Sequence, residues 1–267
     1  IMASEVSSSP ELISENSTII AISQSGESAD VLESVSIAKK KKCKIISIVN
    51  SMTCSLASES SIVIGLNCGP EIGVAATKSF TSQIAIFLKI ILEISPFPIS
   101  FEEISNGIAH ILSNKIIPEI STELSNSSDL YVLGRGLHYP ISLESALKLK
   151  ELTYIHAEGI AGGELKHGPL ALMDKSTFVI MLNPNDSTYV ETLTGAKEIK
   201  SREAIIIGIS EKNHSVYDYW IKIPSSDSIN SIFYESIVVQ LLSYFAALQK
   251  DVNPDYPRNL AKSVTVK

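Results

Sequence analysis

Three charged side chains lie at helical spacing in segment 143–151, which is rich in leucine. Glu144, Lys148 and Glu151 occupy positions i, i+4 and i+7, so in a helix they would share one face. His167 follows in a glycine-rich loop. A carboxylate, an ammonium and an imidazole together can move protons at neutral pH. The alternative interpretation is a solvated salt-bridge ladder, which such spacing often produces.

A second group of polar residues forms the loop Ser23-Gln24-Ser25-Gly26-Glu27-Ser28, between an apolar strand and the start of a helix. The first backbone N–H groups of a helix lack intrahelical partners and carry partial positive charge, so with nearby hydroxyls they can hold an anion. A phosphate monoester fits this pattern, although an ordinary helix cap would use similar residues. The corresponding loop of the second half, 183–187, contains a proline and an aspartate, which predicts one phosphate site per chain.

Two further stretches could contribute to a pocket. Residues 67–81 open a long helix with glycines and hydroxyls, which suits either a backbone-lined pocket or a plain capped helix. Lys262 lies in a non-helical tail, where a lysine held near apolar groups could act as an amine nucleophile. An exposed tail lysine is the default interpretation.

The remaining histidines carry weaker signals. His156 follows a helix end and is predicted to be a structural histidine. His110, His138 and His214 have no supporting acids or glycines nearby in the sequence, and no histidine pair has metal-ligand spacing. We therefore expect no metal and no cofactor.

Composition places these residues in a globular protein. The chain has 267 residues, 45% of them hydrophobic and 19% charged, which suits about two domains. A net charge of −7 argues against nucleic acid as a partner. The odd number of cysteines without a CxxC pair indicates a reducing compartment. The most apolar long stretch, 82–95, is shorter than the ~20 residues of a membrane span, and no signal peptide is evident. We predict a cytoplasmic protein that does not bind membranes.

Short β-branched runs alternate with helical patterns along the chain, which is typical of a parallel sheet covered by helices. Strands are expected at 18–22, 44–49, 62–66, 130–133, 178–182, 204–209 and 220–223. Helices are expected at 28–41, 72–94, 101–124, 141–154, 188–200 and 229–250, and residues 251–267 form an extended tail.

An internal repeat relates the two halves. Residues 18–28 and 177–187 both run from a strand through a loop into a helix that leads to another strand. In the second half a further strand and helix, 130–133 and 141–154, come first, whereas only seventeen residues precede Thr18. Because the chain also opens with Ile1 and not Met, we expect the sequence to start partway through a domain.

Six motifs in order resemble one family along essentially the whole length, the isomerase part of the glutamine:fructose-6-phosphate amidotransferases. The motifs are Ser23-Gln-Ser-Gly-Glu-Ser28, Pro70-Glu-Ile-Gly-Val-Ala-Ala-Thr-Lys-Ser-Phe-Thr81, Leu133-Gly-Arg-Gly136, Ala146-Leu-Lys-Leu-Lys-Glu151, Gly163-Glu-Leu-Lys-His-Gly-Pro169 and Pro257-Arg-Asn-Leu-Ala-Lys-Ser-Val-Thr-Val266.

The resemblance implies an α/β fold of two SIS (sugar isomerase) domains, each a flavodoxin-like parallel sheet between two helical layers. The expected boundaries are 1–98 for the first domain, 99–250 for the second and 251–267 for a tail that completes the active site. The first domain is expected to lack its opening strand and helix, and with them a Cys-Gly-Thr-Ser loop that contacts substrate in the family.

The resemblance also implies roles for particular residues. The side chains expected to bind the sugar phosphate are Ser23, Gln24, Ser25 and Ser28. The backbone of Val74 and Ala261 is expected near the sugar hydroxyls.

In the same resemblance Glu151 is the base that moves a proton between C1 and C2, and Lys148 is its cationic neighbour. His167 opens the sugar ring and comes from a second subunit, so a homodimer is implied. Lys262 is the lysine that can form a Schiff base with the open-chain ketose.

The implied reaction converts fructose 6-phosphate and ammonia to glucosamine 6-phosphate. The glutaminase domain of the family has no counterpart in these residues, so we expect a separate glutaminase domain or subunit as the ammonia source. Three alternatives stay open: a glucosamine-6-phosphate deaminase, a phosphosugar isomerase, and a non-catalytic module that binds sugar phosphates. The complete tail motif favours the amidotransferase, and the absence of a basic DNA-binding segment argues against a regulator.

Overall fold

The computed structural model describes residues 1–225 and 228–263, so the last four residues of the predicted tail lie outside it. The chain divides into two compact units. Unit 1 comprises Ile1–Phe97 together with the C-terminal stretch from Asn259, and unit 2 is Pro98–Arg258.

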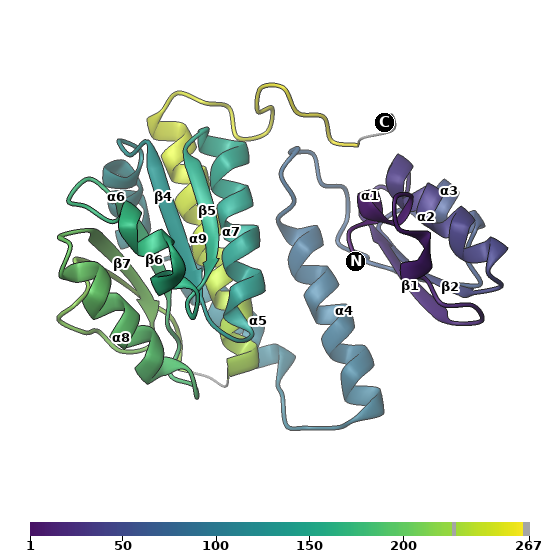
Figure 1. The fold of residues 1–267 in the computed structure, drawn as a ribbon, viewed down its shortest axis with the longest axis horizontal. Coiled ribbons are helices and arrows are strands. Elements are labelled where there is room, and N and C mark those ends of the chain that lie inside the picture. Colours follow the sequence, from purple (N-terminus) through teal and green to yellow (C-terminus); the bar gives the residue numbers. More distant parts are fainter. Residues whose placement is uncertain (226–227, 264–267) are drawn as a thin grey trace. The chain divides into compact units, whose positions relative to one another are not determined.

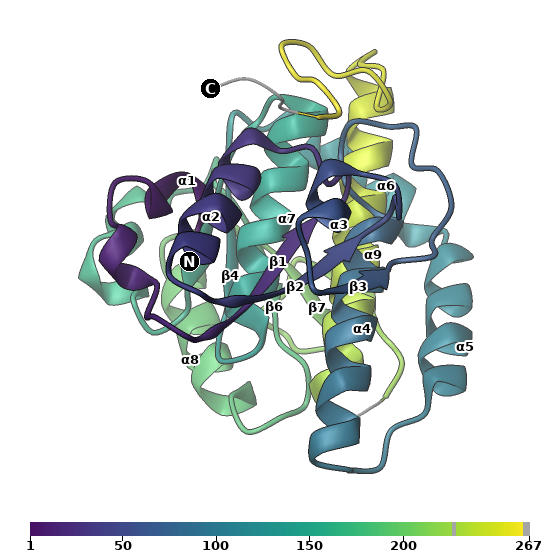
Figure 2. The ribbon, with the colours of Figure 1, turned by 90° about the vertical axis from the view of Figure 1, so that its right-hand side faces the viewer.

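Unit 1 contains a parallel sheet in the order β1-β2-β3 (Figure 2). Its strands are β1 (Thr18–Ser23), β2 (Lys44–Val49) and β3 (Ile62–Gly65). Its helices are α1 (Ala3–Val6), the 3-10 turn η1 (Pro10–Leu12), α2 (Ala29–Lys40), α3 (Ser55–Ser58) and α4 (Lys78–Ile94). Val35 and Ala38 of α2 pack in one core with Ile45, Val49 and Leu56. Burial of these apolar side chains fixes α2 against the sheet.

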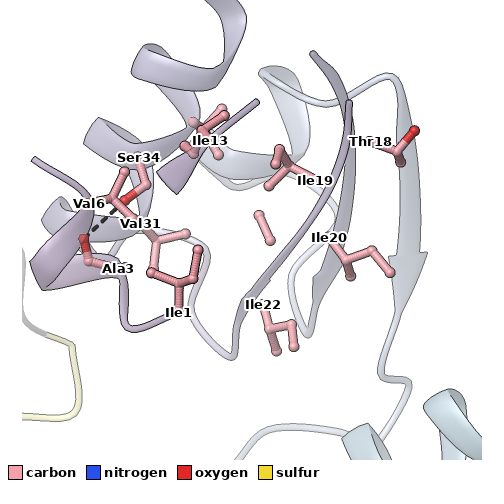
Figure 3. A pocket seen from close by; sticks show the side chains of 12 residues that line it. Ile1, Ala3, Val6, Ile13, Thr18, Ile19, Ile20, Ile22, Val31 and Ser34 are labelled. Carbon is pink, nitrogen blue, oxygen red and sulfur yellow. Dashed lines mark hydrogen bonds between the residues drawn. The ribbon is translucent and has the colours of Figure 1, made fainter. Parts of the chain in front are cut away.

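The edge of β1 that faces away from β2 has no strand beside it among the described residues. Ile20 is 43% exposed and Ile22 37%. A hollow of about 350 Å³ lies along this edge (Figure 3), and no acidic or basic side chain lines it. Its only hydrogen bond drawn in Figure 3 runs from Ser34 Oγ to the Ala3 carbonyl, 3.0 Å. The hollow is therefore apolar and offers none of the chemistry expected from the sequence.

Unit 2 contains a larger parallel sheet in the order β5-β4-β6-β7-β8 (Figure 1). Its strands are β4 (Asp129–Gly134), β5 (His156–Ala161), β6 (Phe178–Leu182), β7 (Ile205–Ser210) and β8 (Tyr219–Lys222). Its helices are α5 (Phe101–Leu112), α6 (Ile116–Leu124), α7 (His138–Thr153), the 3-10 turns η2 (Leu165–His167) and η3 (Pro169–Leu172), α8 (Tyr189–Lys200) and α9 (Ser228–Gln249).

Helices cover both faces of the unit 2 sheet. Helices α7 and α9 pack together on one face, and α8 lies on the other (Figure 1). Alternate residues of β4 point to opposite faces, so Tyr131 and Leu133 join the core that contains Ala196 and Ile199 of α8. The predicted fold class, parallel sheets flanked by helices, is confirmed.

Among the differences between the structure and the predicted elements, three concern longer segments. Strand β5 was not predicted, because His-Ala-Glu-Gly-Ile-Ala has few β-branched residues and follows a helix closely. The helix expected at 101–124 is two helices, and the Asn114 side chain accepts a hydrogen bond from the Ile116 N–H at the start of the second, 3.1 Å. Helix α4 begins at Lys78 and not at residue 72, so residues 67–77 are irregular backbone.

One helix of the described chain is long and apolar enough to cross a membrane, Ile229–Gln249 in α9. The stretch predicted to be the most apolar, 82–95, lies largely in α4. Most of α9 is buried inside the protein, including Val238, Leu242 and Ala246, and it packs against α5, α6 and α7. A core helix of a globular unit has this composition for the same reason as a membrane span, because every side faces apolar groups.

Candidate functional site

The serine-rich loop of unit 1 connects β1 to α2 and is held by its own hydroxyls. Ser23 Oγ accepts a hydrogen bond from the Gly26 N–H at 3.0 Å and lies 3.1 Å from Ser28 Oγ. Ser25 Oγ accepts from the Glu27 N–H at 3.2 Å. Gly26 has a φ of +71°, and a Cβ there would lie 2.1 Å from Cys54 Sγ, so only glycine fits. The turn is thus specified by residue types that the sequence had singled out.

This loop leaves the start of α2 open. Ser28 is the N-cap residue, but its side chain makes no capping hydrogen bond to the helix. The carboxylate of Glu27 instead accepts the Ser55 N–H of α3 at 2.8 Å, and that backbone hydrogen bond lowers the pKa of Glu27. The partial positive charge of the α2 N-terminus is therefore not taken up by the cap residue, which suits an anionic ligand.

The C-terminal tail lies against the same loop within unit 1. Ser263 Oγ is 3.2 Å from Ser25 Oγ. Lys262 Nζ donates to the Gly73 carbonyl at 2.7 Å and to Glu71 Oε2 at 3.0 Å. The default interpretation of Lys262 as an exposed tail lysine is wrong, because its side chain is only 28% exposed and has fixed partners.

The other two residues predicted near the sugar lie beside these contacts in the chain. Val74 follows the carbonyl that accepts from Lys262, and Ala261 immediately precedes Lys262. Val74 is half-buried and Ala261 is exposed. The carboxamide of Gln24 makes no hydrogen bond within the described ranges, while its backbone carbonyl accepts from the Asn50 N–H at 3.1 Å.

Glu71 is the residue of this region that the sequence reasoning missed. Its side chain is 4% exposed and accepts hydrogen bonds from the Thr77 N–H (2.9 Å), the Ser79 N–H (3.2 Å) and Ser79 Oγ (2.5 Å), besides Lys262. Burial raises the pKa of Glu71, but hydrogen bonds from Ser79, Thr77 and Lys262 outweigh it and lower the pKa to about 2. The sequence signal that could have pointed to Glu71 is its position as an acid among glycines and hydroxyl residues just before a helix.

In unit 2 the charged face of α7 is buried. Lys148 is 2% exposed, and its Nζ lies 2.6 Å from Glu151 Oε2 and 3.4 Å from Glu144 Oε1. The shared face predicted from the spacing is confirmed, and the solvated-ladder interpretation is wrong. Burial raises the pKa of Glu144, against the opposing effect of Lys148. Two carboxylates around one buried ammonium are costly for stability alone and are typical of a functional site.

His156 and His167 are both exposed. His167 lies in η2, where its N–H donates to the Glu164 carbonyl at 2.9 Å. Its imidazole makes no hydrogen bond within residues 1–225 and 228–263. His156 Nδ1 lies 3.1 Å from Asp129 Oδ1, so His156 is paired as predicted for a structural histidine.

The structure therefore groups the predicted residues in two sets. The first set belongs to unit 1: Ser23, Gln24, Ser25, Ser28, Val74, Ala261 and Lys262. The second set belongs to unit 2: Lys148, Glu151 and His167.

His138 requires a correction, because the sequence reasoning gave it no supporting acids. Its ring is fully buried, with Nδ1 2.8 Å from Glu235 Oε2 and Nε2 3.1 Å from Asp186 Oδ2. Burial lowers the pKa of His138, but its hydrogen bonds and charge interactions with Glu235 and Asp186 outweigh this and raise it. The partners are 97 and 48 residues away in sequence, which local spacing could not reveal.

No group of three His, Cys, Asp or Glu side chains within the described part of the chain is arranged to hold a metal ion. Both ring nitrogens of His138 lie within hydrogen-bond distance of carboxylate oxygens, those of Glu235 and Asp186. The side chains gathered in the two units offer hydroxyls, carboxylates, ammonium groups and an imidazole.

Comparison with known protein families identifies the family to which the two units belong. The sequence model of the SIS domain family matches residues 2–92 and 123–250. The chain belongs to the SIS domain family. The two matched segments fall one in each unit, so both parallel sheets are SIS sheets.

Individual relatives of these SIS domains agree with the motif resemblance. The glutamine–fructose-6-phosphate aminotransferase [isomerizing] of Methanosarcina acetivorans is 38% identical over 96% of this chain but only 44% of its own length. The chain thus spans less than half of that relative.

Solved structures are similar over more of their length. The C-terminal domain of glucosamine-fructose-6-phosphate aminotransferase from Francisella tularensis is 35% identical, with a TM-score of 0.85 over 91% of this chain and 74% of that one. A glucosamine-6-phosphate deaminase from Thermotoga maritima is 25% identical, with a TM-score of 0.79 over 98% and 80%.

Proposed function

We propose that this pair of SIS domains converts fructose 6-phosphate and ammonia to glucosamine 6-phosphate, as the isomerase part of a glutamine–fructose-6-phosphate aminotransferase. One observation carries the proposal. In unit 1 a hydroxyl-rich loop at an open helix N-terminus contacts a tail whose lysine is held by a carboxylate and a carbonyl. A ligand with both a phosphate and a carbonyl group would use the two features together.

The phosphate is assigned to the loop between β1 and α2. Ser23, Ser25 and Ser28 offer hydroxyls, Gln24 offers an amide, and the first turn of α2 offers backbone N–H groups. Hydrogen bonds to a charged phosphate are stronger than those between neutral groups. The site needs no cationic side chain, which agrees with the acidic net charge of the chain.

The carbonyl chemistry is assigned to Lys262, Glu151 and Lys148. Lys262 is the amine that can first form a Schiff base at C2, with loss of the carbonyl oxygen as water. Ammonia then adds to this Schiff base and displaces the lysine amine, which leaves an imine of ammonia at C2. Glu151 then takes a proton from C1 and returns it to C2. The hydroxyl proton of C1 passes to the imine nitrogen, so that C1 becomes the aldehyde and C2 carries the amine. The ammonium of Lys148, 2.6 Å from Glu151, stabilises the negative charge that develops between these steps.

Three further assignments belong to the same proposal. His167 opens the sugar ring and acts in a second copy of the chain, so the enzyme is a homodimer. Its exposed imidazole is compatible with a partner outside its own chain. The ammonia comes from a glutaminase domain or subunit, and the enzyme is cytoplasmic.

A second candidate is the reverse reaction, deamination of glucosamine 6-phosphate. It is favoured by the similarity to the deaminase from Thermotoga maritima over nearly the whole chain. The same base and lysine would serve both directions, because proton transfer between C1 and C2 is common to them.

The test is to incubate the chain with fructose 6-phosphate, with and without ammonium, and to measure glucosamine 6-phosphate and glucose 6-phosphate. The proposal predicts the amino sugar with ammonium. Glu151→Gln should lower turnover by at least about a hundredfold, as expected for loss of a general base, and leave substrate binding within about twofold. The control Glu158→Gln removes an exposed carboxylate of β5 and should change neither. Binding without any product would leave only a sugar-phosphate-binding module, whereas release of ammonia from glucosamine 6-phosphate alone would favour the deaminase.

A further inference from the structure

The carboxylate of Glu71 bridges two parts of unit 1. On one side it accepts hydrogen bonds from the backbone N–H groups of Thr77 and Ser79 at the start of α4. On the other side it accepts a hydrogen bond from the ammonium of Lys262 in the tail. The bridge joins residues 191 positions apart in sequence.

We propose that Glu71 is a positioning residue that latches the C-terminal tail, and so fixes the amine of Lys262 beside the serine loop. The proposal rests on the proposed function for its catalytic consequence, because only there does Lys262 act on the substrate. The latch itself rests on contacts alone.

The ammonium of Lys262 has its donors directed by the latch. Two of its three N–H bonds go to Glu71 and to the Gly73 carbonyl, at 3.0 and 2.7 Å. Within residues 1–225 and 228–263 no third partner is present, which leaves one N–H direction for a substrate oxygen. After loss of a proton the same nitrogen carries the lone pair for attack on a carbonyl. A lysine on a free tail would spread its amine over many rotamers, so fixing it in advance removes an entropic cost from the reaction.

Glu71 can hold Lys262 firmly because it is itself held. Thr77, the N-cap residue of α4, makes no side-chain capping hydrogen bond of its own, and Glu71 supplies acceptors to the first turn. With its side chain 4% exposed, Glu71 has little freedom to turn into solvent. The helix start, the acid and the tail therefore form one connected group, which extends through Ser263 to Ser25 of the loop.

The latch can be tested without any sugar by limited digestion of the full chain with trypsin. Cleavage after Lys262 needs a free lysine, and cleavage after Arg258 in the same tail serves as an internal reference. Glu71→Gln should raise the ratio of the two rates about tenfold, as expected for loss of a hydrogen bond between charged groups. The matched control Glu59→Gln breaks an exposed carboxylate–lysine pair with Lys39 and should leave the ratio unchanged. An unchanged ratio in Glu71→Gln would overturn the latch.

Lys262→Met tests the same contact from the tail, since it leaves the bonds of Glu71 to α4 in place. Hydrogen exchange of the backbone amides of 259–263 should become faster than in the parent chain. If the exchange rates stay the same, the latch is contradicted even where Glu71→Gln proves too unstable to study.

The catalytic consequence is tested by a double-mutant cycle on the formation of glucosamine 6-phosphate. Glu71→Gln should lower kcat about tenfold with little change in KM for fructose 6-phosphate, because every side chain assigned to the phosphate is kept. In the Lys262→Met background the same substitution should cost nothing further, since Glu71 acts only through Lys262. A further tenfold loss in the double variant would refute the positioning role. If the parent chain makes no product, the proposed function fails while the trypsin ratio still decides the latch.

Discussion

The loops that follow β1 and β6 occupy the same place in the two SIS sheets but contain opposite chemistry. In unit 1 the loop 23–28 carries hydroxyls around an open helix N-terminus. In unit 2 the loop 183–187 carries Asp186, which is bound to the buried ring of His138. The general rule for parallel α/β sheets puts ligands at the carboxyl ends of the strands.

The difference shows how one fold can either keep that position open or fill it from within. His138 is sandwiched between Asp186 and Glu235, and Glu211 lies in the same cluster, with its pKa raised by burial. The carboxylate of Glu211 accepts the Asn185 N–H of the loop at 2.7 Å. The negative charge that a bound phosphate would bring to unit 1 is thus supplied in unit 2 by the protein itself.

The largest expected effect comes from breaking this internal network. Glu235→Ala leaves the fully buried ring of His138 with one carboxylate fewer, and such losses cost about 3 to 5 kcal/mol. The single tryptophan, Trp220 of β8, makes unit 2 easy to follow by fluorescence during urea unfolding. Glu235→Gln keeps the shape and a hydrogen bond and should lose much less. Equal stability of Glu235→Ala and the parent chain would show that the network is not structural.

A substitution in the loop of unit 1 is expected to have a smaller effect, and on ligand affinity. Ser28→Ala removes a hydroxyl of the unit 1 loop and its contact with Ser23 Oγ, but no capping bond of α2, so the helix itself should stay as stable as before. Affinity for fructose 6-phosphate, measured by calorimetry, should fall about tenfold because a hydrogen bond to a charged phosphate is lost. Ser187→Ala in the corresponding loop of unit 2 is the control and should bind the sugar phosphate as the parent does. Equal losses in both variants would remove the contrast between the loops.

The smallest expected effect is the pH dependence of unit 2. The native pKa of His138 is raised by its bonds to Glu235 and Asp186, in spite of burial. Its contribution to stability is therefore complete below its unfolded pKa, about 6.5, and is lost as the pH rises through the native value. The stability difference between the parent chain and His138→Gln, from Trp220 fluorescence in urea, should shrink as the pH rises above about 6.5. A difference that grew with pH would mean that the ring is neutral in the native cluster.

Sequence reasoning found the loop of unit 1 because every part of it is local. The loop residues Ser23, Gly26 and Ser28 are separated by only a few positions in sequence. The hydrophobic pattern clearly predicts the strand before them and the helix after them. The spacing of Glu144, Lys148 and Glu151 also fixed their shared face. What spacing could not give was burial, which decides that Lys148 lies inside the protein and not in a solvated ladder.

Contacts between distant segments were beyond the same reasoning. Glu71 is hydrogen-bonded to Lys262, and His138 to Glu235. The two residues of each pair come together only when the chain folds. Strand β5 was missed for a related reason, since its pairing with β4 outweighs the weak β-propensity of its residues.

The most direct test of the contrast between the two loops is backbone hydrogen exchange with and without fructose 6-phosphate. The amides of 23–31, which include the first turn of α2, should be protected by the ligand, whereas those of 183–189 should exchange at unchanged rates. Protection of 183–189 without protection of 23–31 would contradict the assignment of the phosphate to unit 1.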